Sequence, residues 1–496
     1  MIIVAITGPT PEDARRQLRL SSRYAQMVEF RLDRIADSPV GDLIRGCRKP
    51  WIATCRPVRE GGTYAGDERG RLDRLCDAAK AGAAFVDIEL DAIRDFRALL
   101  TSHHARTRLI VSRHCFDQQP PDIPRTYRAL RAVRADVVKL SFMADDAWQL
   151  SLVRMFLQLA RKDKQHAIAL AMGTAGEASR VLYKMLGGWA TYAAPEEGEP
   201  SAPGQVPARI LHTIYHAHER TRRTKVFGLV GNPVGQSKGV YIHNPLYRSA
   251  GFDGVYVRFP VVDTARFMKD VSPMVSGCSV TLPHKQEMVR YCASCSPEAA
   301  AIGAVNTLVH RRTGWHGANT DAKGALVAIE RRMKVAGKKL VIVGAGGAAR
   351  AIAAEAKHRG ASVVIVNRSD THARTLAGEL GVGWAPLLEL HDLNPEILIN
   401  ATPVGMWPDI QNTPVDAIPP TVRLVFDAIY NPSMTRFLTM GRDRGLVVIT
   451  GVEMYAQQAV EQIRLLTGIR VSAAQVRRRF EIASAALAPG TGKVRT

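Results

Sequence analysis

The chain has 496 residues, of which 46% are hydrophobic and 23% are charged, a composition typical of a folded globular protein. At about 150 residues per domain, this length favours roughly three domains. The formal net charge of +21 would suit nucleic acid, but the basic residues are spread along the chain and no helix-turn-helix, zinc-finger or RNA-binding signature accompanies them. We therefore expect anionic small molecules, and not nucleic acid, as partners.

Membrane and metal-binding functions find no support in the sequence. No run reaches the roughly 18 apolar residues of a membrane span, and the opening residues have a core-strand pattern without a charged leader or a cleavage site. The seven cysteines are scattered, and the lone CxxC pair, Cys292 and Cys295, has no second pair or histidine pattern beside it. We expect a cytoplasmic protein that binds no metal and no membrane; the sequence leaves the oligomeric state open.

The first half of the chain alternates short apolar strands with longer helical stretches rich in arginine and alanine. Strands are expected at residues 2–6, 27–31, 51–55, 85–90, 109–112, 137–140 and 167–171, with an eighth near 190–192. Eight strand–helix units in about 200 residues predict an α/β fold, a parallel (β/α)8 TIM barrel at the short end of its size range. Functional side chains in such a barrel lie at the carboxyl ends of the strands.

A lysine stands among the strand-forming residues of the sixth expected strand. Lys139 is flanked by Val138 and Leu140 and is expected to close that strand. Burial without a partner lowers the pKa of a lysine and leaves a free amine, which can form an imine with a ketone. The alternative is a strand-end lysine whose apolar stem is buried and whose charged head reaches water.

Other polar residues follow the expected strands at the same mouth. His114 follows the fifth strand and would exchange protons near neutral pH. Glu60 would orient it or balance its charge, and Arg180 would hold a carboxylate through two hydrogen bonds. Together these residues predict a site for a polyhydroxylated, anionic ketone. The residues expected to bind its hydroxyl groups are Glu29, Arg31 and Arg56.

Six segments in this half resemble type I 3-dehydroquinate dehydratase, over nearly the whole of residues 1–206. They are, in chain order, Glu29-Phe30-Arg31, Thr54-Cys55-Arg56, Ser112-Arg113-His114, the Lys139 strand, the stretch from Met172 to Arg180, and the stretch from Ser201 to Gln205. The resemblance implies an imine between Lys139 and the ketone of 3-dehydroquinate, with His114 removing a proton from the adjacent carbon before the hydroxyl leaves as water. It also implies that Ser201 and Gln205 lie on a loop that closes over the substrate.

The clearest feature of the second half is a glycine-rich turn between a strand and a helix. A buried-strand run at 339–343 is followed by the turn at 344–349 and a helical stretch at 350–359, the order that a dinucleotide-binding fingerprint requires. Gly344 and Gly346 would allow the turn and close approach of the backbone, Ala349 would fill the third small position, and the helix N-terminus would face the pyrophosphate.

The strand expected at 361–366 indicates which dinucleotide is used. It ends in Asn367-Arg368-Ser369 and lacks the acidic residue with which NAD enzymes bind the ribose hydroxyls. Arg368 suits a 2′-phosphate, so NADP(H) is the expected cofactor; the alternative is that Arg368 is a solvated residue at a strand end.

Lys285 and Asp321 are candidates for the acid–base pair that accompanies hydride transfer. Such a pair across a cleft would move a proton to or from a substrate oxygen while a hydride moves on carbon. The second half resembles shikimate dehydrogenase over nearly its whole length, through residues 231–239, 281–285, 344–349, 367–369, 400–406 and 451–454 together with Asn306, Asp321, Tyr430 and Gln458.

This second resemblance assigns three groups of residues. It implies Lys285 and Asp321 as the catalytic pair. It places at the shikimate site Ser237, Thr281, Asn306, Tyr430, Gln458 and Gln462. It places beside the cofactor Gly344, Ala345, Gly346, Gly347, Ala348, Asn367, Arg368, Ser369, Thr402, Met406 and Gly451.

Two residues depart from the pattern of the second family. Gly239 stands where a second serine usually helps to hold the substrate carboxylate, so we expect shikimate binding to be weaker by about 1–3 kcal/mol if a buried acceptor is left unpaired. His372 replaces a common arginine, and whether Arg374 substitutes for it decides the affinity for the 2′-phosphate.

The two resemblances define the expected domains and reaction. The domains are a dehydratase barrel at 1–206, a connecting helix and linker at 207–224, a shikimate-binding domain at 225–330, a Rossmann NADP domain at 331–450, C-terminal helices returning to the substrate domain at 451–487, and a disordered tail at 488–496. The expected function is dehydration of 3-dehydroquinate to 3-dehydroshikimate followed by reduction to shikimate with NADPH. The alternatives are a quinate-preferring dehydrogenase half and a non-catalytic regulator that senses metabolites.

Overall fold

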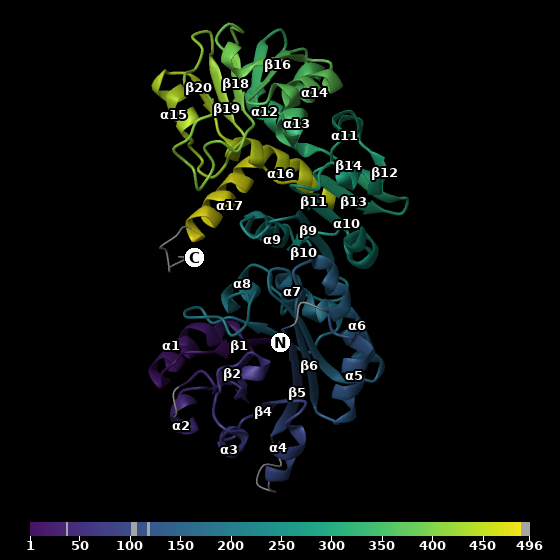
Figure 1. The fold of residues 1–496 in the computed structure, drawn as a ribbon, viewed down its shortest axis with the longest axis vertical. Helices are drawn as coiled ribbons and strands as arrows, with labels where there is room; N and C mark the ends of the chain where they lie inside the picture. Colours follow the sequence, from purple (N-terminus) through teal and green to yellow (C-terminus); the bar gives the residue numbers. More distant parts are fainter. Residues whose placement is uncertain (36–37, 101–106, 117–119, 488–496) are drawn as a thin grey trace. The chain divides into compact units, whose positions relative to one another are not determined.

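The protein consists of two compact units in the computed structural model, which describes residues 1–35, 38–100, 107–116 and 120–487 (Figure 1). Unit 1 comprises Met1–Val240 and Asp253–Val275, and unit 2 comprises Tyr241–Phe252 and Ser276–Thr496. The tail expected at 488–496 lies outside the described residues. Within the part of the chain that is described, no helix has the length and apolar character needed to cross a membrane.

Unit 1 contains a barrel of eight parallel strands. In sheet order these are β7 (His166–Met172), β6 (Val137–Met143), β5 (Arg108–Cys115), β4 (Phe85–Glu89), β3 (Trp51–Thr54), β2 (Met27–Arg31), β1 (Ile2–Ile6) and β8 (Thr191–Ala193). The Trp189 amide, just before β8, donates to the Ala167 carbonyl of β7 at 2.8 Å and brings the two edges together. The predicted (β/α)8 architecture is therefore confirmed.

Amphipathic helices cover the outside of the barrel strands (Figure 1). They are α1 (Pro11–Ser21), α2 (Val40–Leu43), α3 (Glu68–Lys80), α4 (Ile93–Leu99), α5 (Ile123–Ala132), α6 (Leu150–Lys162) and α7 (Gly176–Leu186), followed by the short α8 (Ala208–Thr213). In α5, the Asp122 side chain accepts from the Arg125 amide and Pro124 stands in the first turn, where its missing N–H removes no helical hydrogen bond.

Three boundaries differ from those expected. β5 continues through His114 and β6 through Met143, so His114 lies inside its strand and Lys139 is the third residue of β6, not its last. The reason is that His114 pairs with Ser141 across the parallel ladder, and backbone pairing continues where the apolar run stops. The connecting helix expected within residues 207–224 ends at Thr213, and His216 has a left-handed φ of 47° that an α-helix cannot contain.

Two further strands of unit 1 follow the barrel. β9 (Lys225–Gly231) and β10 (Gly254–Pro260) form a parallel pair. The turn after β9 leads into α9 (Gly239–Ser249). This turn carries Ser237.

Unit 2 begins with strands β11 (Gly277–Val280), β12 (Cys292–Cys295), β13 (Thr307–Arg311) and β14 (Gly314–Ala318). β13 pairs antiparallel with β11 and β14, and β12 runs parallel to β14. The helices of this region are α11 (Pro297–Ile302), α12 (Thr320–Glu330), α16 (Gly451–Thr467) and α17 (Ala473–Ala486). α12 and α16 approach closely because Gly324 has no side chain: a Cβ there would lie 2.8 Å from the Gln458 backbone nitrogen.

The rest of unit 2 is an open parallel sheet of six strands with helices on its faces (Figure 1). The order is β17 (Gly383–Pro386), β16 (Ser362–Asn367), β15 (Lys339–Val343), β18 (Ile397–Asn400), β19 (Leu424–Asp427) and β20 (Val447–Ile449), accompanied by α13 (Gly347–His358), α14 (Asp370–Leu380) and α15 (Arg436–Asp443). The strand order reverses at β15, and in such sheets ligands bind at the carboxyl end of that point. The expected Rossmann fold is confirmed.

Candidate active sites

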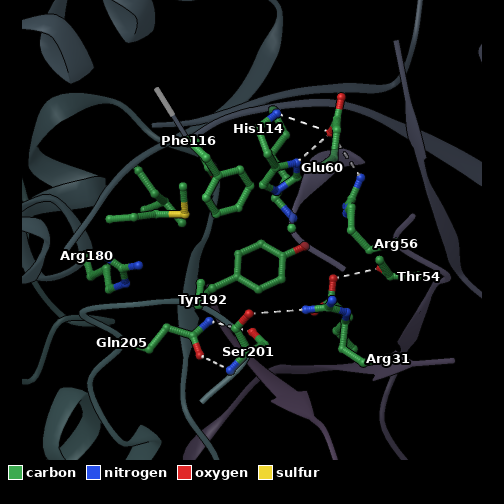
Figure 2. Close-up of a pocket in the computed structure, with 17 residues that line it drawn as sticks. Arg31, Thr54, Arg56, Glu60, His114, Phe116, Arg180, Tyr192, Ser201 and Gln205 are labelled. Carbon is green, nitrogen blue, oxygen red and sulfur yellow. Dashed lines mark hydrogen bonds and ion pairs between the residues drawn. The ribbon is translucent and has the colours of Figure 1, made fainter. Parts of the chain in front are cut away.

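The barrel mouth holds a pocket in which the nine residues predicted for the dehydratase meet. Its volume is about 490 Å³, which includes space open to solvent, and its lining includes Glu29, Arg31, Arg56, Glu60, His114, Lys139, Arg180, Ser201 and Gln205 (Figure 2). These residues come from six different strands or the segments that follow them, so only the closed sheet brings them together.

Lys139 is buried, with 5% of its surface exposed, and its ammonium group has a carboxylate partner. Lys139 Nζ lies 2.8 Å from Asp87 Oδ2 on β4. The same nitrogen lies 4.0 Å from the ring centroid of Tyr192 on β8, within cation–π distance. The sequence argument treated this lysine as buried without a partner; the structure corrects this, because Asp87 balances its charge.

Arg56 joins the same buried group of charges. Its Nη2 lies 2.7 Å from Asp87 Oδ1, and its Nη1 lies 2.5 Å from Glu89 Oε1. Arg56 also donates to Ser112 Oγ at 2.8 Å. Although burial acts to raise it, the charges of Arg56 and Lys139 hold the pKa of Asp87 far below its usual value. Arg56 is thus engaged by protein carboxylates.

His114 and Glu60 form a hydrogen-bonded pair at the edge of this group. His114 Nδ1 lies 3.0 Å from Glu60 Oε2, and the His114 backbone amide donates to the same oxygen at 3.2 Å. Burial, reinforced by the positive charges of Arg56 and Lys139, lowers the pKa of His114 well below its usual value. Burial also raises the pKa of Glu60 to about 7, against the charge of Arg56. A neutral imidazole whose Nδ1–H donates to ionised Glu60 has Nε2 free to take a proton.

Arg180 is the arginine of this pocket without a carboxylate partner among the residues that the structure describes. It is 1% exposed, and its guanidinium donates to the carbonyls of Ala171, Gly176 and Pro203. Burial lowers the pKa of Arg180 to about 10, opposed by the charge of Glu177. A buried guanidinium that lacks a counter-ion is a strong attraction for an anionic ligand.

The remaining predicted residues are held by neighbouring groups. Arg31 is bound through two nitrogens to Asp33, at 2.9 and 2.8 Å, and Glu29 accepts from Thr54 Oγ1 at 2.7 Å. Gln205 donates to Ser201 Oγ at 2.8 Å and accepts from the Ser201 amide at 2.9 Å. Ser201 and Gln205 therefore form one rigid corner of the loop.

Sequence reasoning missed several polar residues of this site. Asp87 and Glu89 were the most important omissions, although a signal was present: both carboxylates stand on one face of a strand that is otherwise apolar, in the segment Phe85–Glu89. The other omissions were Asp33, Thr54, Ser112 and Tyr192.

In unit 2, Lys285 and Asp321 are in direct contact. Lys285 Nζ lies 2.6 Å from Asp321 Oδ2, and their side chains are 20% and 14% exposed. Asp321 stands in the first turn of α12, whose first amides are capped by Asn319. The predicted pair is therefore brought together at the start of α12, and both side chains are partly open to solvent.

Asn306, Gln458 and Gln462 form a buried network beside this pair. Asn306 Nδ2 donates to Thr320 Oγ1 at 2.9 Å, and its Oδ1 accepts from the Thr320 amide at 2.9 Å. Thr320 Oγ1 also donates to Gln458 Oε1 at 3.2 Å. Gln462 Nε2 donates to the Asn306 carbonyl at 3.1 Å. These contacts fix the start of α12, on which Asp321 stands.

Thr281, Tyr430 and Ser237 occupy less enclosed positions. Thr281 is half-buried, and Tyr430 is 41% exposed with its ring 5.8 Å from that of Tyr455. Ser237 belongs to unit 1, where its hydroxyl accepts from the Gly239 amide at 3.2 Å and its carbonyl accepts from Arg258 Nη2 at 2.7 Å. A Cβ on Gly239 would lie 3.1 Å from Tyr256 Cε1, so the Tyr256 ring occupies the space beside this glycine.

The glycine turn after β15 fits a dinucleotide. Gly344 has a φ of 117°, and a Cβ there would lie 3.0 Å from the Ala401 carbonyl oxygen, so only glycine suits this position. A Cβ on Gly346 or Gly347 would meet nothing within 4 Å, which leaves open space at the N-terminus of α13. Open space in front of unpaired helix N–H groups is what a pyrophosphate requires. Ala345 lies in the same turn, and Ala348 is the second residue of α13, which begins three residues before the helix expected at 350–359.

The end of β16 presents the residues expected near the adenosine ribose. Asn367 Nδ2 donates to the Ser369 carbonyl at 3.1 Å. Arg368 is exposed and has no ion-pair partner in the described part of the chain. Arg374 stacks on Trp384, with its guanidinium carbon 4.6 Å from the ring centroid, and His372 is exposed.

A buried amide–carboxylate pair shapes the loop that carries Thr402 and Met406. Asn400 accepts from Thr402 Oγ1 at 2.7 Å and donates to Asp427 at 3.2 Å. Burial raises the pKa of Asp427 to about 6. Gly451 lies against the segment that follows β19, since a Cβ there would come within 2.3 Å of the Ile429 carbonyl oxygen. Met406 is 46% exposed at the same end of the sheet.

Comparison with known proteins matches both halves to enzyme families. Residues 2–222 match the model of type I 3-dehydroquinase, residues 229–308 that of the shikimate dehydrogenase substrate binding domain, and residues 327–404 that of shikimate / quinate 5-dehydrogenase. The chain is 35% identical to the chloroplastic bifunctional 3-dehydroquinate dehydratase/shikimate dehydrogenase of Arabidopsis thaliana, over 90% of this chain and 78% of the relative.

The chain belongs to this bifunctional family. It is thus a shikimate-pathway enzyme that joins a type I dehydroquinase, a lyase, to a shikimate dehydrogenase, an oxidoreductase. Among other relatives, the shikimate biosynthesis protein AroDE of Chlamydia pneumoniae is 28% identical over 94% of this chain and 95% of its own length. The shikimate dehydrogenase (NADP(+)) of Caldanaerobacter subterraneus is 36% identical over 49% of this chain and 92% of its own length.

Family membership confirms the predicted family, fold and bifunctional activity, and it favours catalysis over the alternative of a metabolite-sensing regulator. The roles of individual residues, the domain boundaries and the cytoplasmic location stay predictions.

Proposed function

We propose that Lys139 forms the imine with the ketone of 3-dehydroquinate and that His114 is its proton-transfer partner. The observation that supports this most is the placement of both side chains in one pocket, with the amine held by Asp87 at 2.8 Å and the imidazole held by Glu60 at 3.0 Å. Asp87 would help to balance the positive charge of Lys139 before the reaction. It would also help to balance the charge of the protonated imine during the reaction.

The chemical steps then follow in order. The amine of Lys139 adds to the ketone carbon, and water leaves as the protonated imine forms. His114 takes a proton from the neighbouring carbon, because the imine withdraws the electrons of that C–H bond. The ring then expels its hydroxyl, which leaves as water after receiving a proton from the imidazolium. Hydrolysis of the imine releases 3-dehydroshikimate and restores the lysine.

Arg180 would hold the substrate carboxylate. It is the buried guanidinium of the pocket that lacks a carboxylate partner among the described residues, whereas Arg31 and Arg56 are both paired with protein carboxylates. A substrate carboxylate would therefore supply the missing counter-ion. Arg31 and Glu29 would bind ring hydroxyls, and the Ser201–Gln205 corner would cover the substrate.

In the dehydrogenase half, Lys285 and Asp321 would hold and move the proton on the oxygen of the reacting carbon. Their contact at 2.6 Å supports a shared proton, and the Asn306–Thr320–Gln458 network would keep Asp321 in place. Thr281, Tyr430 and Gln462 would complete the part of the shikimate site that unit 2 carries, and Ser237, on unit 1, stays a prediction from the sequence.

NADP(H) would supply the hydride when bound, on the turn that follows β15. The residues at 344–348 would face its phosphates, Asn367, Arg368 and Ser369 its adenosine ribose, and Thr402, Met406 and Gly451 its nicotinamide end. The open space at Gly346 and Gly347 and the exposed Arg368 support this assignment. Arg368→Ala is expected to raise the KM for NADP+ more than that for NAD+, because the charge would act on the 2′-phosphate.

The decisive test of the dehydratase proposal is covalent trapping. Borohydride added with 3-dehydroquinate should leave a stable adduct on Lys139, identified by peptide mass. Lys139→Ala should abolish dehydration and trapping while shikimate oxidation by the same protein continues. Trapping at another residue, or dehydration by Lys139→Ala, would refute the proposal.

A further inference from the structure

Tyr192 carries a buried hydroxyl that the catalytic scheme does not use. The residue lies on β8 and is 3% exposed, and its hydroxyl has no hydrogen-bond partner among the described residues. Two other buried tyrosines of the barrel are satisfied: Tyr127 donates to Asp163 at 2.7 Å, and Tyr183 accepts from the amino group of Met1 at 2.8 Å. An unsatisfied buried hydroxyl costs about 1–3 kcal/mol, so its place in the structure needs an explanation.

The hydroxyl belongs to the dehydratase pocket. Tyr192 lines that pocket, and its ring lies 4.0 Å from Lys139 Nζ. In Figure 2 the hydroxyl end of the ring is directed towards Thr54 and Arg56, and Arg180 lies on the opposite side of the ring. A ligand in the pocket would therefore meet the hydroxyl on the side of the polar residues of β2 and β3.

The electrostatic surroundings keep this group a hydrogen-bond donor. Burial, followed by the negative charges of Glu29 and Asp87, raises the pKa of Tyr192 well above its usual value. The phenol is therefore a hydrogen-bond donor near neutral pH. It can give one hydrogen bond and receive another, which matches an alcohol on a substrate better than it matches a carboxylate.

The position of the substrate follows from the two anchors proposed above. With the carboxylate at Arg180 and the ketone carbon at Lys139 Nζ, the far side of the six-membered ring faces Tyr192. That side carries the secondary hydroxyl next to the ketone, on the neighbour of the ketone that keeps its proton and lies across the ring from the carboxylate-bearing carbon. A hydroxyl at this place gives the phenol the partner that the protein does not provide.

We propose that Tyr192 is a further substrate-binding and specificity-determining residue of the dehydratase, whose phenol exchanges a hydrogen bond with the secondary hydroxyl beside the substrate ketone. This proposal rests on the proposed roles of Lys139 and Arg180. Because a ligand without that hydroxyl would leave the phenol unpaired, the enzyme discriminates against the deoxy compound.

The test is a cycle of two enzymes and two substrates. Wild type and Tyr192→Phe are each assayed with 3-dehydroquinate and with its analogue that lacks the hydroxyl beside the ketone. Either change alone should lower kcat/KM about threefold to tenfold, the effect of one neutral hydrogen bond. The kcat/KM of Tyr192→Phe with the analogue should be no lower than that of either single change. The proposal would be overturned if the two reductions in kcat/KM multiplied when the variant was assayed with the analogue. It would also be overturned if Tyr192→Phe had an unchanged kcat/KM with 3-dehydroquinate.

The controls distinguish failure of this proposal from failure of the proposed mechanism on which it rests. Tyr127→Phe makes the same chemical change in a buried tyrosine outside the pocket and should leave the dehydratase constants unchanged. The shikimate dehydrogenase activity of each variant reports whether unit 2 is folded, and borohydride trapping at Lys139 reports whether the barrel is. Borohydride should still trap Lys139 in Tyr192→Phe; if wild type is not trapped there, the proposed mechanism itself has failed.

Discussion

The two sites of this enzyme differ in how they handle charge. In the barrel, Lys139, Arg56, Asp87 and Glu89 lie in one buried cluster, each with a partner within 2.8 Å. In unit 2, the ion pair of Lys285 and Asp321 is partly open to solvent, and neutral amides hold the neighbouring Thr320. In the proposed mechanism the barrel stabilises a positive charge on a covalent intermediate, a task for fixed carboxylates. The dehydrogenase pair would only relay a proton, because the cofactor would bring the hydride.

The largest effect should come from breaking the buried cluster. Asp87→Asn removes the charge that holds both Lys139 and Arg56, and loss of one partner from a buried ion pair costs about 3–5 kcal/mol. We expect dehydration to fall by at least about 100-fold while shikimate oxidation is retained.

The matched control for Asp87 is Asp91→Asn. It removes the same charge from an exposed carboxylate that pairs with Arg59, and it should change dehydration less than threefold. Steady-state assays of both activities on each variant make the measurement. Near-normal dehydration by Asp87→Asn would show that the reaction does not need the charge of Asp87.

Asp321→Asn tests the open site in the same way. The variant keeps the shape of the side chain but cannot take the proton that Lys285 shares with it, so we expect kcat for shikimate oxidation to fall by about 10²–10⁴-fold. Dehydration by the same chain should be unchanged. A fall in the affinity for shikimate with kcat intact would instead assign Asp321 to binding.

The pH dependence of dehydration should distinguish the two sites further. The pKa of Glu60 is raised to about 7, and its ionised form is the stronger acceptor for His114 Nδ1–H and stabilises the imidazolium that forms when Nε2 takes a proton. The kcat/KM for dehydration should therefore rise about tenfold between pH 6 and pH 8. Glu60→Gln should remove this rise, and the same inflection in the variant would assign the titration to another group.

The smallest expected effect concerns Gly239. Restoring a serine hydroxyl there should lower the KM for shikimate by no more than about threefold to tenfold, since the gain is one hydrogen bond and the new Cβ must displace Tyr256 Cε1, 3.1 Å away. Gly239→Ala carries the same Cβ without the hydroxyl and is the matched control. Equal KM values for shikimate in the two variants would mean that the serine hydroxyl has no acceptor on the substrate. In the wild-type enzyme, a KM for quinate below that for shikimate would favour the quinate alternative.

Much of the architecture was predictable because local signals carry it. The barrel was predicted from eight apolar runs at regular spacing, and the Rossmann sheet from a strand, a glycine turn and a helix in sequence. Gly344 illustrates why such signals are reliable. Its φ of 117° excludes residues that carry a side chain, so the glycine itself indicates the backbone conformation.

The sequence by itself determined the family, the fold and which residue types would gather, since these follow from periodicity and from motifs. Only the tertiary structure decided which charges neutralise one another. Asp87 lies 52 residues from Lys139 and reaches it only because β4 and β6 stand on either side of β5 in the sheet. The same closure left Arg180 without an ion-pair partner, and the Tyr192 hydroxyl without a hydrogen-bond partner, among the described residues. Contacts between distant strands depend on sheet order and register, which no local pattern specifies.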